Sequence, residues 1–238
     1  MSENKIKLIK SELRGIADKN KATILSRFFK TGLGQYGQGD KFLGVVVPEQ
    51  RIIARKFIDL KLGDLQKLLD SPYHEERLTG LLILVLKYPH ANKLEQKKIY
   101  NFYLKNTKKI NNWDLVDLTA EKIIGPYLEN KDKSILFKLA RSKNLWERRI
   151  AILSTFYYIK KGESELTFQI SELLLEDKQD LMHKAVGWML REVGKRCSEK
   201  TEENFLKKYY KQMPRTMLRY AIERFEENKR LKYLNNKI

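Results

Sequence analysis

Hydrophobic side chains recur along most of this chain at intervals of three and four residues. A spacing of this kind places them on one face of an α-helix. The clearest faces are Ile6, Ile9, Leu13 and Ile16; Leu78, Leu81, Leu82 and Val85; and Ile170, Leu173 and Leu174. The pattern predicts an all-α protein of roughly a dozen helices arranged in pairs.

Prolines and glycines indicate where these helices begin and end. Pro48 opens the stretch PEQRIIARKFIDL, because proline suits the first turn of a helix. Gly63 and Asp64 are expected to cap the short helix of GDLQKLLD, and the prolines at 72, 89 and 214 mark further boundaries. Pro126 is different, because it falls inside the apolar run IIGPYLEN. We expect it to kink or end a helix there.

One segment, residues 31–51, has five glycines and no helical period. Its Gly32, Gly34 and Gly37 match the G-x-G-x-x-G pattern by letter, but they follow a helix instead of opening one, so a dinucleotide site is rejected. Residues 42–47, FLGVVV, form the only convincing β-branched run and predict a strand or an extended segment. We expect a long ordered loop that joins the first helical pair to the rest and is a candidate to line a groove.

A regular spacing links four residues near the starts of successive helical stretches. Arg77, Trp113, Arg149 and Lys184 stand 36, 36 and 35 residues apart. A fixed period in this range is typical of stacked helical repeats, in which equivalent positions line up on one side. The sequence therefore predicts one α-superhelix of HEAT-like repeats over residues 1–238, with three cations and a tryptophan along a groove.

The charge of the chain points to a polyanionic partner. Lys and Arg number 48 against 30 Asp and Glu, which gives a net charge of +18. Nucleic acid is favoured over an anionic membrane surface, because no apolar span of ~20 residues is present. Many lysines, such as Lys97 and Lys98, have the simpler interpretation of solvated surface residues.

Cysteine and histidine usage argues against a metal site or a disulfide framework. Cys197 is the only cysteine, which favours a reducing cytoplasm. His74, His90 and His183 are far apart in the sequence and lack zinc-ligand spacing. We expect each of them to be a surface or capping residue, and we expect no cofactor.

Three pairs of residues combine a tryptophan with a charged side chain on one helix face. Two positions separated by three or four residues leave a helix on the same side. The pairs are Trp113 with Asp117, Trp146 with Arg149, and Trp188 with Arg191. A core position is the main alternative for Trp146, and a solvated or capping role is the alternative for Asp117. A carboxylate on a basic face repels phosphate, however, so the presence of Asp117 there indicates a role other than binding the DNA backbone.

Several of these stretches, taken in order, resemble the DNA alkylation repair enzyme family. They are NNWDLVD, LWERRIAIL and KAVGWMLRE, together with the earlier FFKTG and GDKFLGVVVPEQR. The resemblance covers residues 20–195. It implies a HEAT-like α-superhelix that excises cationic alkylated purines from DNA.

The resemblance also implies roles for individual residues. Asp117 would be the catalytic carboxylate, Trp113 and Trp188 would contact the deoxyribose of the lesion, and Arg149 would meet the DNA backbone beside it. Phe28 stands where the family often has a tyrosine, so a hydroxyl is missing from that DNA contact.

Three further cations, Arg77, Lys184 and Arg191, are expected on the DNA-binding side. The first aromatic residue of the tryptophan motif is also absent, because Asn112 precedes Trp113. The departure at Phe28 leaves the acid and both tryptophans in place.

The chemistry of these residue types is consistent with that activity. A purine alkylated at N3 or N7 is cationic and departs as a neutral base, leaving an oxocarbenium-like sugar. An ionised Asp117 would stabilise that sugar and orient water, and tryptophan faces would favour its positive charge. We expect a monomeric, cytoplasmic, monofunctional glycosylase acting on double-stranded DNA that contains alkylated bases.

Two other functions remain open at this point. A non-catalytic HEAT-repeat protein that binds structured or damaged nucleic acid is the alternative, and a protein–protein scaffold fits the cation line poorly. The preferred lesion is left open.

Overall fold

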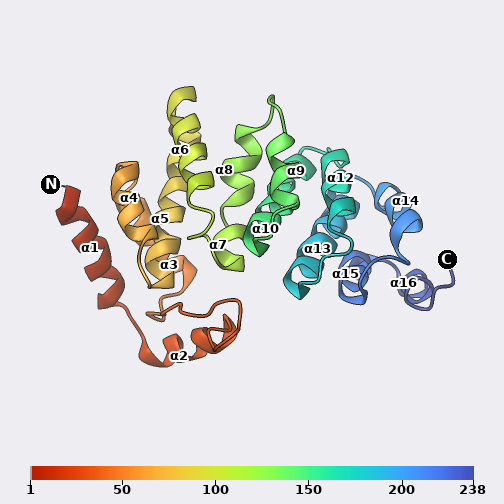
Figure 1. Cartoon of the computed structure of the whole chain (residues 1–238), viewed down its shortest axis with the longest axis horizontal. Helices are drawn as coiled ribbons and strands as arrows, with labels where there is room; N and C mark the ends of the chain where they lie inside the picture. Colours follow the sequence, from red (N-terminus) through yellow and green to blue (C-terminus); the bar gives the residue numbers. More distant parts are fainter. Residues whose placement is uncertain (1) are drawn as a thin grey trace. The chain divides into compact units, whose positions relative to one another are not determined.

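The computed structural model describes residues 2–238, and every secondary-structure element in that range is helical (Figure 1). It has sixteen α-helices and two 3-10 helices in this range, packed in repeats, which confirms the all-α class and is consistent with an α-solenoid. The number exceeds the sequence estimate, in part because α7 and α11 have only five and four residues, too few to show a period. None of the helices within residues 2–238 is both long enough and apolar enough to span a bilayer.

The chain divides into two compact units, Met1–Ile123 and Ile124–Ile238. The elements of the first unit are α1 (Ser2–Gly15), α2 (Lys19–Phe28), α3 (Val47–Lys56), α4 (Leu62–Leu69), α5 (His74–Lys87), η1 (Tyr88–His90), α6 (Lys93–Lys105) and α7 (Trp113–Asp117). Helix α8 (Ala120–Tyr127) spans the division. A single domain over the whole chain stays a prediction.

The core of the first unit is built around α5. Its residues from Leu78 to Leu84 are all buried, and α3 and α4 pack against it. A helix that is apolar on every side belongs inside a protein, because no face of it suits water. The predicted face of α5 is therefore one part of a helix buried on all sides, although Val85 is only partly buried.

The faces predicted for two other helices are correct except at their ends. Ile6, Ile9 and Leu13 of α1 are buried, but the inclusion of Ile16 is wrong. The helix ends at Gly15, so Ile16 leaves the shared face and is 44% exposed. Leu173 was likewise expected with Ile170 and Leu174, but it ends α12 and is 38% exposed.

The glycine-rich segment is a loop up to Val47, where α3 begins with Pro48 in its first turn. The strand or extended segment expected at residues 42–47 forms no strand within the described chain, which has one isolated bridge, between Lys41 and Tyr73. Gly44 has a φ of 85°, and a Cβ there would lie 2.1 Å from the carbonyl oxygen of Asp18. Only glycine allows this close approach of the loop to the start of α2.

A buried carboxylate, instead of a neighbouring strand, satisfies the backbone of this segment. Glu75, in the first turn of α5, accepts hydrogen bonds from the backbone N–H groups of Leu43 (3.0 Å), Gly44 (2.8 Å) and Val45 (3.3 Å). Buried N–H groups need partners, and here one side chain satisfies three of them. The loop is therefore tied to α5 by an ionisable group.

The elements of the second unit follow α8. They are α9 (Ser134–Ala140), α10 (Leu145–Ser154), α11 (Phe156–Ile159), α12 (Glu165–Leu173), α13 (Asp180–Arg196), α14 (Glu199–Tyr209), α15 (Arg215–Ala221), η2 (Ile222–Arg224) and α16 (Glu227–Leu234). As expected for Pro126, α8 ends one residue later, at Tyr127.

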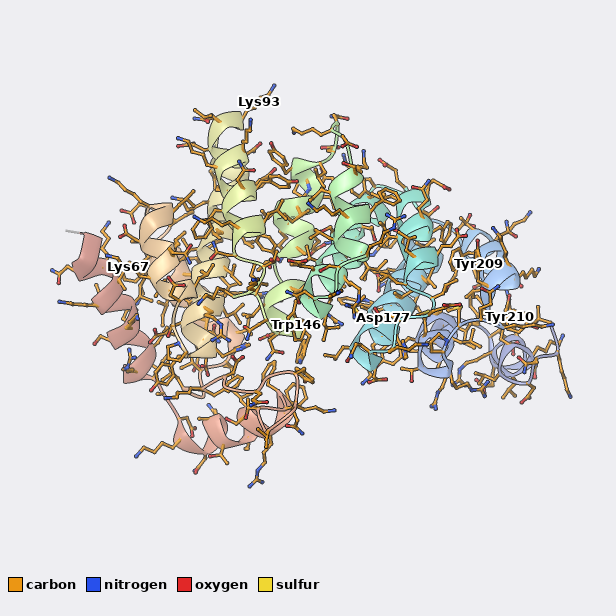
Figure 2. The ribbon with its side chains drawn as sticks, in the orientation of Figure 1. Lys67, Lys93, Trp146, Asp177, Tyr209 and Tyr210 are labelled. Carbon is orange, nitrogen blue, oxygen red and sulfur yellow. The ribbon has the colours of Figure 1, made fainter. Side chains whose placement is uncertain are left out.

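Helix α13 is the centre of the second unit and packs against α10, α14 and α15. A Cβ on Gly187 would lie 2.4 Å from the carbonyl oxygen of Met217, so glycine is required for the contact between α13 and α15. Trp146 of α10 is 7% exposed, so the core alternative holds for it (Figure 2).

Candidate active site

The short helix α7 carries the acid and the first tryptophan. Trp113 is its first residue and Asp117 its last, and both side chains are partly buried. The side-chain oxygen of Asn112 accepts a hydrogen bond from the Trp113 N–H at 2.8 Å and caps the helix. The spacing of four residues places both side chains on the same side of this one turn.

The ring of Trp113 is held by two phenylalanines from the end of α2. It stacks on Phe29, with centroids 5.0 Å apart and an interplanar angle of 16°. Phe28 meets it edge-on at 5.7 Å and is itself 61% exposed. Phe29 stacks in turn on Phe42 at 5.1 Å. We call Trp113, Phe28, Phe29 and Phe42 the Trp113 cluster.

A buried network of charges lies against this cluster. The Nε2 atom of His74 is 2.8 Å from an oxygen of Asp114, and its Nδ1 atom is 3.4 Å from an oxygen of Asp40. Arg77 pairs with the same oxygen of Asp40 at 2.8 Å. The His74 ring stacks on Phe42 with centroids 4.7 Å apart. We call His74, Asp40, Arg77 and Asp114 the His74 network.

The expectation that His74 is a surface or capping residue is wrong, because its side chain is 2% exposed. Burial opposes its protonation, but the charge of Asp114 and the hydrogen bonds to Asp114 and Asp40 outweigh that cost and raise the pKa of His74 to about 9. Burial favours a neutral Asp40, yet the hydrogen bond from His74 and the charge of Arg77 lower the pKa of that carboxyl. His74 is therefore an imidazolium at neutral pH.

Arg77, expected on the DNA side, lies inside the protein. It is 4% exposed, pairs with Asp40 and donates to the carbonyl oxygen of Ser71 at 3.0 Å. Its charge balances buried carboxylates, and two exposed lysines, Lys108 and Lys109, line a pocket of about 320 Å³ beside it.

Asp117 acts electrostatically on its surroundings. Burial raises the pKa of the Tyr103 hydroxyl, the hydrogen bond with Thr119 lowers it, and the charge of Asp117 raises it further. An anionic Asp117 thus lies close enough to disfavour a second negative charge at Tyr103.

The second unit surrounds its tryptophan differently. Trp188 of α13 is partly buried, and its ring centroid lies 5.9 Å from that of Phe156. Lys160 and Arg196 lie over the Phe156 ring, at 4.4 Å and 5.2 Å from its centroid. We call these four residues the Phe156 cluster. Sequence reasoning missed three of them, although the spacing of four between Phe156 and Lys160 is the usual signal for a shared helix face.

The predicted cations of the second unit all have partners within the protein. Arg149 is 5% exposed and donates to the carbonyl oxygen of Leu181 at 2.5 Å. Lys184 pairs with Asp180 at 2.6 Å, and Arg191 pairs with Glu223. Contact with phosphate would require these side chains to exchange a protein partner for DNA.

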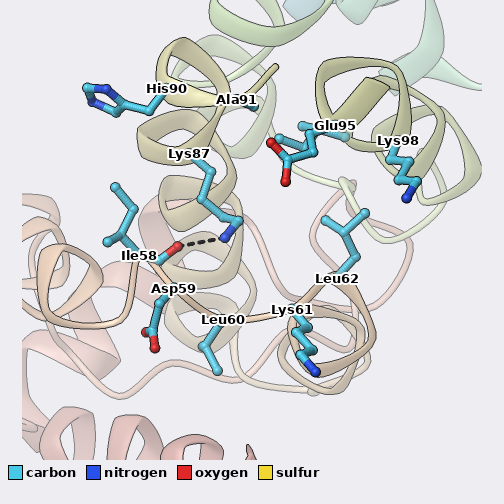
Figure 3. A pocket seen from close by; sticks show the side chains of 11 residues that line it. Ile58, Asp59, Leu60, Lys61, Leu62, Lys87, His90, Ala91, Glu95 and Lys98 are labelled. Atoms are coloured by element: carbon cyan, nitrogen blue, oxygen red, sulfur yellow. Dashed lines mark hydrogen bonds between the residues drawn. The ribbon is translucent and has the colours of Figure 1, made fainter. Parts of the chain in front are cut away.

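A separate pocket of about 570 Å³ contains none of the predicted site residues (Figure 3). It lies between the α3–α4 connection and the facing ends of α5 and α6, and Lys87 donates across one side of it to the carbonyl oxygen of Ile58 at 2.7 Å. Among the side chains that the structure describes, those of residues 4–238, no group of three or more His, Cys, Asp or Glu could hold a metal ion.

Comparison with known proteins gives one family. Residues 9–225 match the family described as DNA alkylation repair enzyme, whereas no curated protein matches the chain. Among solved structures, a predicted DNA alkylation repair enzyme from Enterococcus faecalis is similar, with a TM-score of 0.67 and 15% identity, covering 89% of this chain and 97% of that chain. At that identity the likeness concerns the fold. Because the family match covers most of its length, this chain belongs to the DNA alkylation repair enzyme family.

Proposed function

We propose that this protein is a DNA glycosylase that hydrolyses the N-glycosidic bond of purines alkylated at N3 or N7, the first step of base excision repair. The observation that carries the proposal is α7, which has Asp117 and Trp113 partly buried on the same side of a single turn. The family membership and the net charge of +18 support DNA as the substrate.

In this mechanism Asp117 acts on the sugar and not on the base. As the cationic purine departs, positive charge develops on the deoxyribose, and the carboxylate stabilises that charge and orients the attacking water. The electron-rich face of Trp113 favours the same charge. Because the base leaves as a neutral molecule, its departure requires no proton donor.

The second unit supplies DNA contacts in this proposal. Trp188 meets the deoxyribose, and Arg149, Lys184 and Arg191 turn from their protein partners to phosphates. In the first unit, exposed Phe28 lies on the DNA side. Arg77, buried against Asp40, is assigned a structural role instead.

The test is release of free base from a methylated duplex by the wild type and by Asp117→Asn. Removing one electrostatic contributor to a transition state costs about 10²–10³ in rate, so we expect that loss with DNA affinity unchanged or slightly higher. Asp70→Asn is the matched control, because Asp70 is an exposed acid of the same unit, paired with Lys109. It should release base at the wild-type rate.

Two outcomes would contradict the proposal. Wild-type turnover by Asp117→Asn would remove the catalytic assignment. Tight binding of methylated DNA without any base release by the wild type would favour the non-catalytic alternative.

A further inference from the structure

His74 contacts three segments that are distant in the sequence. It lies at the start of α5, its Nε2 atom meets Asp114 of α7 at 2.8 Å, and its Nδ1 atom faces Asp40 of the loop at 3.4 Å. Its ring also packs against Phe29 and Phe42, with centroids 4.9 Å and 4.7 Å away. Phe29 is the ring on which Trp113 stacks. His74 therefore touches α7 both through Asp114 and through the support of Trp113.

Helix α7 depends on such contacts for its orientation. With five residues it is one turn, and a helix of that length is not stable in isolation. Asp114, its second residue, is 6% exposed, and its carboxylate lies in the His74 network. A buried bond between two charged groups is strong and directional. It is well suited to fix the rotation of α7 about its axis.

We propose that His74 is a positioning residue: in its charged form it holds α7 through Asp114 and so sets the direction of the Asp117 carboxylate and the Trp113 ring. The inference rests on the proposed function of Asp117. A neutral imidazole has one N–H, whereas the charged ring has two and can donate to both carboxylates. Loss of the proton therefore removes one of these two hydrogen bonds and the positive charge that attracts both carboxylates, which weakens the hold of His74 on α7.

The charged groups around His74 determine when this happens. Asp114 faces it from α7 and Asp40 from the loop, and both favour the proton, whereas Arg77 on α5 opposes it. Because the pKa of His74 is raised to about 9, activity should be constant around pH 7 and fall as the pH passes 9.

The first test is His74→Gln, which preserves polarity but carries no charge. A misplacement of about 1 Å in an active site can cost about 10²-fold in rate, so we expect a 10- to 100-fold lower single-turnover rate at saturating enzyme. DNA affinity should change less than about twofold, because His74 does not reach the surface. The fall in rate above pH 9 should disappear. Asp114→Asn should have the same effect, and the double variant should be no worse than either single one.

The matched control is Glu76→Gln on the same turn of α5. Glu76 is fully buried and pairs with Lys10 (3.0 Å) and Arg14 (2.8 Å) of α1, so its loss also disturbs a buried ion pair in this unit. The Glu76→Gln variant should have lower thermal stability than the wild type. It should keep the wild-type single-turnover rate and the fall in rate above pH 9. Equal losses of rate in Glu76→Gln and His74→Gln, or an alkaline fall that persists in His74→Gln, would overturn the proposal.

A measurement without substrate separates this proposal from the proposed function. Amide hydrogen exchange over residues 112–118, at one fixed pH, should be faster in His74→Gln than in the wild type and unchanged in Glu76→Gln. If the wild type released no base, the proposed function would fail. The exchange measurement would still show whether His74 holds α7. Unchanged exchange in His74→Gln would refute it. If His74→Gln does not fold, the exchange of the wild type is measured between pH 7 and pH 10 and corrected for intrinsic rates. Faster exchange of residues 112–118 above pH 9 would support the proposal, and unchanged exchange would refute it.

Discussion

The two tryptophans assigned to the DNA lesion have opposite surroundings. Trp113 is packed among the uncharged rings of the Trp113 cluster, with Asp117 on its own helix turn. Trp188 lies beside Phe156, whose ring carries Lys160 and Arg196 above it. A ring next to a carboxylate suits a developing cation, whereas a ring among cations suits phosphate. In the proposed function, Trp113 therefore serves the chemistry, whereas Trp188 meets the deoxyribose from beside cations that suit phosphate.

The buried charges of the units differ in the same way. In the first unit the His74 network and Glu76 are matched by opposite charges. In the second, Glu202 is 2% exposed, and one of its oxygens has no hydrogen-bond partner among the described residues. Burial, and secondly the charge of Glu199, raises the pKa of Glu202 to about 9 although Lys229 and Arg191 lower it. The first unit keeps its buried groups charged, and the second keeps this one neutral.

The largest expected effect concerns the charge of the lesion. If Asp117 and Trp113 act only on a developing cation, N3- and N7-alkylpurines should be released, whereas uracil and hypoxanthine should be released at least about 10²-fold more slowly. The measurement is a substrate panel in duplexes of equal length. Efficient release of uracil would reveal a proton donor and would contradict the proposed difference between Trp113 and Trp188, in which Trp113 acts on a developing cation.

The stability of the two units should respond differently to neutralising a buried group. Glu202 has a pKa near 4.5 when unfolded and about 9 when folded, so its contribution to stability is present below pH 4.5 and is lost as the pH rises towards 9. At pH 7 the loss is about 3 kcal/mol, so Glu202→Gln should stabilise the protein by about that amount. Urea unfolding at pH 5 and pH 7 measures it, and the gain should be much smaller at pH 5.

His74 provides the contrasting case. Its pKa rises from 6.5 to about 9 on folding, so it contributes about 3 kcal/mol that is fully present below pH 6.5 and lost as the pH passes 9. His74→Gln should therefore be less stable than the wild type at pH 6, with the difference vanishing above pH 9. The same unfolding series measures this, and a pH-independent difference would contradict it.

Smaller effects are expected for DNA binding by the Phe156 cluster. Lys160→Gln and Arg196→Gln should each reduce the slope of log affinity against log salt by roughly one unit. Arg149→Gln and Lys184→Gln should do the same if those side chains exchange their partners for phosphate. Titrations of undamaged duplex at several salt concentrations measure the slopes, and a plot parallel to that of the wild type excludes a phosphate contact.

The smallest effect is expected at Phe28. Its ring is edge-on to Trp113 and largely exposed, so Phe28→Tyr adds a hydroxyl without disturbing the cluster. One added hydrogen bond contributes about 0.5–1.5 kcal/mol, which corresponds to an increase in DNA affinity of up to about tenfold. Competition binding of DNA to Phe28→Tyr and to the wild type measures this difference in affinity. A weaker complex would show that the hydroxyl does not face DNA.

The helical fold could be predicted from the sequence because periodicity and proline placement are local signals. Both the face of α1 and the end of α8 after Pro126 follow from residues that are neighbours in the chain. The pairing of Trp113 with Asp117 on α7 is local in the same sense.

The surroundings of those residues depend on contacts across long separations, which a single sequence does not encode by spacing. His74 meets Asp114 across 40 positions, so spacing did not reveal that His74, predicted as a surface or capping residue, and Arg77, predicted as a DNA contact, are buried. One signal was available. The helix that follows is apolar on all sides, so its first turn must also lie inside, and buried charges need partners.

That first turn of α5 has a consequence for how the chain folds. Its four residues bind three other parts of the first unit: His74 binds α7, Glu76 binds helix α1, and both Glu75 and Arg77 bind the loop. The contacts made by Glu75 and His74 close loops of 32 and 40 residues, and the entropy of closing them must be overcome before they are stabilising. Refolding of α1, the loop and α7 should therefore occur in one late cooperative step, with α5 formed first as the shared template.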